Sequence, residues 1–242
     1  MSASNSQSPT FAALGVAAEI CDALAARGIT HTFAIQELTL PIALAGHDLI
    51  GQARTGMGKT YGFGVPVLDR VFDDAAIEEL DGTPRALIIA PTRELAVQVG
   101  EDLKVAASQL PLRLATLCGG HPYEGQIKQL ETGVDVIIGT PGRLLDLSQQ
   151  GHLVLDHVAI LVLDEADEML DLGFLPDIQK ILKALHGNKH QTMLFSATMP
   201  GPILTLSRTF MNKPLRIRAE AGEESQTHAS TRKVTFLSLI HI

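Results

Sequence analysis

Short apolar runs alternate with longer amphipathic segments along most of this chain, and this alternation restricts the fold more than any other feature. The runs lie at residues 49–50, 86–90, 112–118, 134–139, 158–163 and 192–195, with a last run at 215–217. A loop and a helix-like segment follow each of the first six. Strands of this kind, separated by helices, are typical of a parallel sheet covered on both faces. The sequence therefore predicts an α/β fold with a parallel β-sheet flanked by helices.

The ends of the chain differ from its body. Residues 1–9 are polar and rich in Ser, which predicts a disordered tail without a signal peptide. Residues 10–218 form the expected domain and begin with two helices, predicted over 11–27 and 35–45, the first ending at Gly28. Residues 219–233 lack a periodic apolar face and are interpreted as a linker. No apolar run is long enough to cross a bilayer, so no membrane contact is expected.

A glycine-containing segment between an apolar run and a helix carries the strongest chemical signal. Its residues are Ala53, Arg54, Thr55, Gly56, Met57, Gly58, Lys59 and Thr60. Gly56 and Gly58 allow close approach of the backbone to phosphate oxygens, which the helix N-terminus attracts. Lys59 would reach the β- and γ-phosphates of ATP, and the Thr60 hydroxyl would bind Mg²⁺. Ala53 replaces the first glycine of the general pattern, and the alternative is a plain glycine-rich turn.

Acidic residues follow the apolar run that ends at residue 163. They are Asp164 and Glu165, then Asp167 after one alanine. A carboxylate at the end of a buried strand, close to a phosphate loop, suits Mg²⁺ coordination, and we assign this role to Asp164. Glu165 could polarise an attacking water as a general base. The alternative is an acidic helix N-terminus favoured by the helix dipole. Lys59 and Thr60 upstream favour the catalytic interpretation.

Further motifs follow the other apolar runs in a characteristic order. They are Pro91-Thr92-Arg93-Glu94-Leu95-Ala96, Gly119-Gly120, Thr140-Pro141-Gly142-Arg143 and Ser196-Ala197-Thr198. With the quartet Asp164-Glu165-Ala166-Asp167, this set resembles the DEAD-box RNA helicase family, bacterial type, over roughly residues 10–218. The resemblance implies the N-terminal RecA-like domain of an enzyme that hydrolyses ATP, with Mg²⁺, in an RNA-dependent way and separates short duplexes.

The resemblance also implies an adenine-reading element upstream of the phosphate loop. Phe11 and Gln36 match its aromatic and amide residues, because a ring can stack on adenine and an amide can both donate to it and accept from it. This chain departs from the family pattern by having Thr32-Phe33-Ala34-Ile35 where prolines are usual. The alternative is that Phe11 is a core anchor and that Gln36 lies near a helix N-cap. The implied nucleotide contacts are Phe11, Gln36, Ala53, Thr55, Gly56, Met57, Gly58, Lys59 and Thr60.

An RNA surface is implied as well. The matching residues are Pro91, Thr92, Arg93, Gly119, Gly120, Thr140, Gly142 and Arg143. Glycines and helix N-termini would contact the sugar–phosphate backbone, so binding would not depend on base sequence. By the same resemblance, Asp167, Ser196 and Thr198 couple hydrolysis to RNA binding. The alternative is that the two threonines only cap helices and the two arginines form surface ion pairs. A net charge of −8 does not favour a nucleic-acid partner but leaves room for a local basic groove.

The family uses two RecA-like domains, and the second supplies arginines that stabilise the transferring phosphate. We expect this chain to lack that domain and therefore to bind nucleotide weakly and hydrolyse it poorly. Residues 234–242 are either a truncated start of the second domain or a non-native tail. The second interpretation arises because residues 237–242 resemble the translation of a transposon-end adapter, a DNA segment that is added to genes in sequencing libraries.

Two rival functions remain at this stage. One is a DNA-directed helicase or translocase, and the other is a non-enzymatic module that binds RNA or protein. Whether RNA or DNA stimulates ATP hydrolysis would distinguish an RNA helicase from the first rival. A Glu165→Gln substitution would abolish an ATPase but leave a non-enzymatic binding module unaffected. Two cysteines without an export signal indicate reduced thiols and a cytoplasmic protein.

Overall fold

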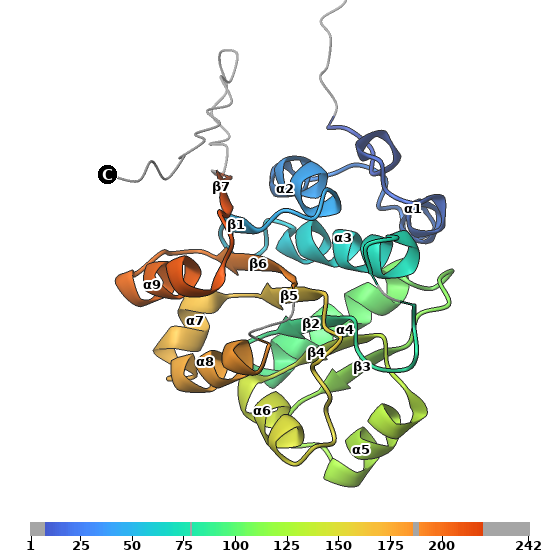
Figure 1. The fold of residues 1–242 in the computed structure, drawn as a ribbon. Helices are drawn as coiled ribbons and strands as arrows, with labels where there is room; N and C mark the ends of the chain where they lie inside the picture. The colour runs from blue at the N-terminus through green and yellow to red at the C-terminus, as the bar shows by residue number, and fades with distance from the viewer. Residues whose placement is uncertain (1–7, 78, 186–188, 220–242) are drawn as a thin grey trace, which may run out of the picture.

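The computed structural model describes residues 8–77, 79–185 and 189–219. Their strands form one parallel sheet of seven in the order β3-β4-β2-β5-β6-β1-β7 (Figure 1). The strands are β1 (Leu49–Gln52), β2 (Ala86–Ile89), β3 (Leu114–Leu117), β4 (Val136–Gly139), β5 (Ile160–Leu163), β6 (Gln191–Ser196) and β7 (Leu215–Arg218). The predicted parallel sheet is confirmed, and each of the seven apolar runs overlaps one strand.

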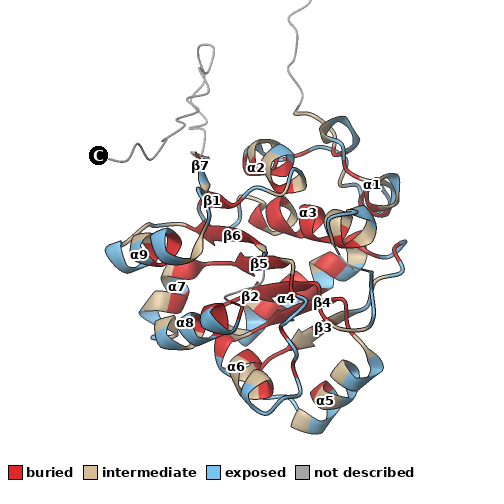
Figure 2. Cartoon of the chain, in the orientation of Figure 1, coloured by how far each residue is buried: buried red, intermediate tan, exposed pale blue. Residues whose placement is uncertain are grey.

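Helices cover both faces of this sheet. On one face lie α1 (Ala18–Ala25), α2 (Ala34–Leu44), α3 (Lys59–Asp73) and α4 (Arg93–Ala106). On the other lie α5 (Tyr123–Thr132), α6 (Pro141–Gln149), α7 (Ala166–Asp171), α8 (Leu175–Ala184) and α9 (Gly201–Phe210). Successive strand residues point to opposite faces, so Ile88 packs into the first apolar core and Leu87 into the second. Figure 2 shows the buried central strands between the two helical layers.

The prediction of one continuous helix over residues 11–27 was wrong. Ala12–Leu14 form a single 3₁₀ turn, and α1 begins only at Ala18. Gly15 separates the two because its φ of +87° places it in the left-handed region, where its N–H bonds to the carbonyl of Ala12. The second predicted helix, 35–45, is confirmed as α2 with its bounds shifted by one residue.

The strand order sorts the sequence motifs into two groups. Because all strands are parallel, the loops that follow them lie along one edge of the sheet, and ligands bind at this edge in open α/β sheets. The adjacent strands β3, β4 and β2 lead into Gly119-Gly120, 140–143 and 91–96. The adjacent strands β5, β6 and β1 lead into 164–167, 196–198 and 53–60. We call these two groups of loops, after the ligands that the sequence predicts for them, the nucleic-acid half and the nucleotide half.

Several predicted segments fall outside the described residues. These are most of the tail 1–9, the linker 219–233 except for its first residue, and the segment 234–242. Within the described part, no helix has both the length and the apolar character needed to cross a lipid bilayer.

Candidate nucleotide and nucleic-acid site

The phosphate-loop segment joins β1 to α3 and has the backbone that its glycines predict. Gly56 and Gly58 have φ values of +83° and +80°, which few other residues adopt without strain. Gly58 is the N-cap of α3, so the first N–H groups of that helix point into the loop. Ala53, in place of the first glycine, is buried, and its N–H bonds to the carbonyl of Ser196 at 3.2 Å. The backbone of Ala53 therefore connects the start of the phosphate loop to β6.

Lys59 and Glu165 connect the loop to the acidic segment. Lys59 Nζ lies 2.8 Å from Glu165 Oε1, and both side chains are more than nine-tenths buried. Thr55 Oγ1 donates to the same carboxylate oxygen at 2.9 Å, and Lys59 Nζ also donates to the carbonyl of Ala53 at 3.1 Å. The predicted cation and the predicted base are thus direct partners. A phosphate that binds Lys59 would compete with Glu165 for the ammonium group.

The backbone at Glu165 is unusual. Glu165 has φ +49° and ψ +54°, a left-handed conformation that is strained for a residue with a side chain. It lies at the N-cap of α7, directly after the buried strand β5, and its N–H donates to Asp164 Oδ1 at 3.0 Å. This turn directs the Glu165 side chain toward the phosphate loop, whereas Asp164 remains buried at the end of β5.

Asp164 is fully enclosed, and its acidity changes accordingly. Burial is the main cause that raises the pKa of Asp164 to about 7, and the neighbouring Glu165 carboxylate adds to the effect. Lys59 acts in the opposite direction. A cation placed beside Asp164 would favour its ionised form, so the site is suited to a metal ion or another positive charge.

The last acidic residue of the quartet is tied to the Ser-Ala-Thr motif. Asp167 Oδ2 accepts hydrogen bonds from the N–H and the hydroxyl of Thr198, each at 2.8 Å. The N–H of Asp167 donates to Ser196 Oγ at 3.1 Å. Partial burial raises the pKa of Asp167, but the hydrogen bonds from Ser196 and Thr198 outweigh it, and the net pKa lies below its usual value. The three predicted coupling residues therefore form one hydrogen-bonded unit.

The two predicted adenine residues are both enclosed by protein. Phe11 is 2% exposed and packs in the first apolar core. Gln36 is 1% exposed, its Oε1 accepts from the N–H of Phe33 at 2.9 Å, and its Nε2 donates to the carbonyl of Gly58 at 2.8 Å. Gln36 thus touches the phosphate loop, and each end of its amide makes one hydrogen bond within the protein. Thr60 and Met57 are half-buried in the loop region.

The nucleic-acid half is open to solvent. Gly119, Gly120, Gly142 and Arg93 are exposed, and Arg143 is half-buried. A β-carbon placed on Gly120, whose φ is +77°, would come 2.8 Å from Arg93 Nη1, so the first arginine lies against the double glycine.

The second arginine approaches the same loop from the other side. The Arg143 guanidinium lies 4.9 Å from the centre of the Tyr123 ring, and its Nη1 is 3.5 Å from the carbonyl of His121. The two arginines from separate strand ends thus converge on one loop.

The alternative roles of the threonines and arginines can be compared with the geometry. Thr92 does cap α4, because its hydroxyl accepts from the N–H of Leu95 at 3.2 Å. Thr140 is the N-cap of α6 but makes no capping bond with its side chain. Neither Arg93 nor Arg143 is paired with a carboxylate within the part of the chain that the structure describes. The surface ion pairs of the alternative interpretation are therefore not formed among those residues.

Comparison with known proteins decides between the phosphate-loop families. The model of the DEAD/DEAH box helicase family matches residues 33–206, which span the phosphate loop, the acidic quartet and the Ser-Ala-Thr motif. The chain belongs to this family. Among curated relatives, it is 48% identical to the chloroplastic DEAD-box ATP-dependent RNA helicase 3B of Zea mays, over 86% of this chain and 28% of that protein. It is 43% identical to the DEAD-box ATP-dependent RNA helicase CshA of Geobacillus kaustophilus, over 88% of this chain and 44% of that protein.

Solved structures of the family have the same fold. A DEAD box protein of Methanococcus jannaschii matches with a TM-score of 0.79 and 37% identity, covering 88% of this chain and 57% of that one. A hypothetical ATP-dependent RNA helicase of Sulfolobus tokodaii matches with a TM-score of 0.75 and 33% identity, over 83% and 56%. The predicted RecA-like fold is confirmed. This DEAD-box chain spans between 28% and 44% of the length of the curated relatives quoted above.

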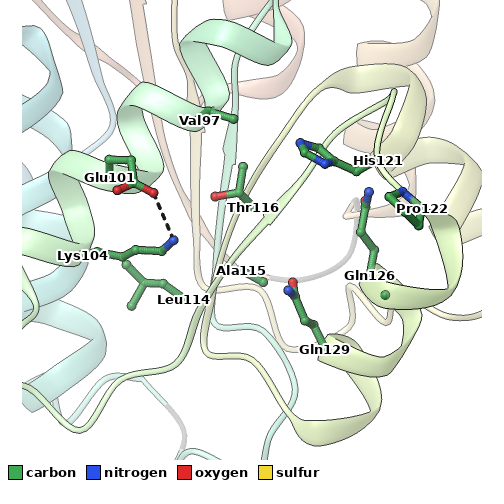
Figure 3. A pocket seen from close by; sticks show the side chains of 11 residues that line it. Val97, Glu101, Lys104, Leu114, Ala115, Thr116, His121, Pro122, Gln126 and Gln129 are labelled. Atoms are coloured by element: carbon green, nitrogen blue, oxygen red, sulfur yellow. Dashed lines mark hydrogen bonds and ion pairs between the residues drawn. The ribbon is translucent and has the colours of Figure 1, made fainter.

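Sequence reasoning missed two features of this DEAD-box domain. Phe33 appeared only as a departure from the family pattern, yet its ring lies beside the phosphate loop. A cavity of about 360 Å³ between α4, β3 and α5 is the second (Figure 3). The buried Gln126 lines it, donates to the carbonyl of Cys118 at 3.0 Å, and has an Oε1 without a described partner. No local sequence signal marks the cavity, because it forms between an edge strand and two helices.

Proposed function

We propose that this chain is the ATP-binding RecA-like domain of an ATP-dependent RNA helicase. In the two-domain protein, RNA-dependent ATP hydrolysis would drive the local separation of RNA strands. The observation that carries the proposal is the 2.8 Å contact between Lys59 and Glu165, which joins the phosphate loop to the acidic quartet. The names of its relatives, which are ATP-dependent RNA helicases, support the same activity. A second RecA-like domain would be the principal protein partner.

The residues present fit ATP and Mg²⁺. The loop backbone around Gly56 and Gly58 would hold the phosphates, with Lys59 on the β- and γ-phosphates. Thr60 and Asp164 would hold Mg²⁺, and the metal would draw its remaining ligands from phosphate and water. No cluster of three or more His, Cys, Asp or Glu suited to a metal occurs among the described residues, which is consistent with that arrangement. ATP with Mg²⁺ supplies the transferable phosphoryl group.

Glu165 is the proposed general base. While it is bonded to Lys59 and Thr55, its Oε1 is not free to accept a proton from water. Transfer of Lys59 to a phosphate would release the carboxylate, which could then orient and deprotonate the attacking water. The left-handed backbone at Glu165 aims this side chain at the phosphate loop.

RNA would bind along the nucleic-acid half through its sugar–phosphate backbone, without base specificity. Arg93 and Arg143 would contact phosphates, and the exposed glycines would allow close approach of the strand. The hydrogen-bonded unit of Asp167, Ser196 and Thr198 would relay changes at the acidic quartet to this surface. We also propose a cytoplasmic location, supported by two cysteines that are both unpaired.

Titration calorimetry with ATP and Mg²⁺ on the chain and on its Lys59→Ala variant tests this proposal. We expect measurable binding that weakens at least tenfold in the variant, because Lys59 supplies the main charge on the phosphates. Lys104→Ala, on an exposed lysine of α4, is the matched control and should bind as the parent chain does. Circular dichroism verifies the fold of each variant. A folded parent chain that binds no nucleotide at millimolar concentration contradicts the proposal.

A further inference from the structure

An aromatic ring, and not a carboxylate, restricts the position of Arg143. The guanidinium carbon lies over the Tyr123 ring, 4.9 Å from its centre. One terminal nitrogen, Nη1, also donates to the carbonyl of His121 at 3.5 Å. A cation–π contact leaves the positive charge unneutralised, and the bond to His121 uses only one of the five N–H groups of the guanidinium. Arg143 is therefore oriented by its neighbours while its charge and most of its donors stay available to a ligand.

The Tyr123 ring is itself fixed by contacts on more than one element. Tyr123 is the first residue of α5 and follows Gly120 by three residues, so its backbone is tied to the loop after β3. His152, just beyond α6, meets the ring nearly at a right angle (77°), with 6.4 Å between the ring centres. The Tyr123 hydroxyl is enclosed by protein. The ring thus gives Arg143 a fixed surface to lie against.

The other arginine of the nucleic-acid half has no such support. Arg93 is exposed and lies against Gly120, and among the described residues no aromatic ring contacts its guanidinium. A long arginine side chain loses much rotamer freedom when a ligand immobilises it. For Arg93 this entropy is lost when the ligand binds, whereas the Tyr123 ring has already restricted Arg143. A group that is ordered beforehand binds its ligand at a smaller entropic cost.

We propose that Tyr123 is a positioning residue for RNA, whose ring holds the Arg143 guanidinium in the orientation that binds a backbone phosphate. Two in-plane N–H groups of a guanidinium match two oxygens of a phosphate, so the orientation of the plane affects the strength of the contact. The inference rests on the proposed RNA surface and deepens it, because it makes the affinity at Arg143 depend on a residue outside the proposed RNA contacts.

A set of substitutions separates the ring from the charge and from the fold. Tyr123→Leu removes the ring and keeps apolar bulk, and Tyr123→Phe keeps the ring. Arg143→Ala removes the guanidinium, and the double variant Tyr123→Leu/Arg143→Ala tests whether Tyr123 acts through Arg143. Phe72→Leu is the matched control, because Phe72 is a half-buried aromatic residue near the end of α3, on the other face of the sheet.

Fluorescence anisotropy with a labelled single-stranded oligouridine measures the affinity of each variant at several salt concentrations. We expect Tyr123→Leu to weaken binding about two- to fivefold, the range of an exposed cation–π contact. The slope of log affinity against log salt should fall by up to about 0.7, the value for one phosphate contact. Tyr123→Phe and Phe72→Leu should match the parent. In the Arg143→Ala background, Tyr123→Leu should have no further effect. Thermal unfolding verifies the fold of each variant.

Each other outcome contradicts a specific statement. If Tyr123→Leu binds RNA like the parent, or if its effect adds to that of Arg143→Ala, Tyr123 does not act through Arg143. An equal loss in Tyr123→Phe would assign the effect to the hydroxyl, and an equal loss in Phe72→Leu would assign it to packing in general. In all these cases the RNA surface stands as long as Arg143→Ala weakens binding. If Arg143→Ala binds RNA like the parent, or the parent binds no RNA, the proposed role of Arg143 fails together with this inference.

Discussion

The two halves of the ligand-binding edge differ in where their charges are satisfied. In the nucleotide half, Lys59, Glu165 and Asp164 are buried, and the first two are paired with each other at 2.8 Å. In the nucleic-acid half, Arg93 and Arg143 face solvent or a ring and have no described carboxylate partner. A ligand must therefore replace internal bonds in one half, whereas it adds new bonds in the other.

This difference has consequences for coupling. Replacement of an internal ion pair changes the protein, because the released Glu165 carboxylate and the turn that carries it must find a new arrangement. The unit of Asp167, Ser196 and Thr198 begins two residues after Glu165 and spans the ends of β5 and β6. Addition of RNA phosphates to exposed arginines requires no such change. The comparison predicts that pH and stability report on the nucleotide half, whereas salt reports on the nucleic-acid half.

The largest expected effect concerns Asp164. Its pKa is raised to about 7 in the fold, against about 3.9 in an unfolded chain. Between these values the folded state holds a proton that the unfolded state has lost, so the contribution of Asp164 to stability is greatest below pH 4 and is lost as pH rises from 4 through 7. The loss is on the order of 2–4 kcal/mol. Urea unfolding of the nucleotide-free chain at pH 5 and pH 8 measures it.

Asp164→Asn is the matched variant, because it keeps the shape of the side chain without the titration. The difference in unfolding free energy between pH 5 and pH 8 should shrink by most of that amount. Asp81 is the control site, since its carboxylate lies outside both halves. Equal pH dependence in the parent and in Asp164→Asn would show that another group dominates.

The strands and the polar motifs that follow them could be predicted from local sequence, but the grouping of the motifs could not. An apolar run followed by a polar motif identifies a strand end, and this placed Lys59, Asp164 and Arg93 correctly after β1, β5 and β2. The lateral order of the strands depends on pairings between residues far apart, such as Ile50 with Leu194. That order alone puts the Ser196 strand between the other two of the nucleotide half.

The burial of the aromatic residues could not be predicted from local sequence, for a physical reason. A lone Phe in a loop or at a helix end has no periodicity that reveals its burial. Phe11 is buried because the chain near it pairs with residue 31 through the bridge of Thr10 and His31, and through bonds between Thr32 and Pro9. Phe33 lies just beyond that bridge and faces the loop. Both residues thus lie next to one long-range contact, which local sequence does not reveal.

The second prediction tests the exposed half. Arg93→Ala and Arg143→Ala should each weaken binding of a labelled single-stranded RNA about fivefold to tenfold, because each removes a phosphate contact of about 1 kcal/mol. The loss should be the same for oligouridine and oligoadenine. The slope of log affinity against log salt should fall by about 0.7 for each lost contact. Fluorescence anisotropy at several salt concentrations measures both quantities.

Lys128→Ala is the control for these arginines, because Lys128 is an exposed cation on α5. Because Lys128 is outside the proposed RNA contacts, its variant should leave the affinity and the salt slope close to those of the parent chain. Arginine variants that match the Lys128 variant would place the RNA elsewhere. A loss confined to one of the two homopolymers would indicate contacts with bases in place of the backbone.

The smallest expected effect distinguishes two threonines of the nucleic-acid half that look equivalent in sequence. Thr92 and Thr140 each follow a strand and precede a helix, but only Thr92 accepts a capping bond, from Leu95. Thr92→Ala should therefore lower the unfolding free energy by about 1 kcal/mol, within the range for a lost N-cap. Thr140→Ala should lower it by only a few tenths, since no capping bond is lost. Chemical denaturation of the two variants measures this difference.

If Thr140→Ala destabilises the chain as much as Thr92→Ala while RNA binding stays unchanged, Thr140 is a structural cap. If it weakens RNA binding at unchanged stability, its hydroxyl is available to the ligand, as the open geometry of this half requires.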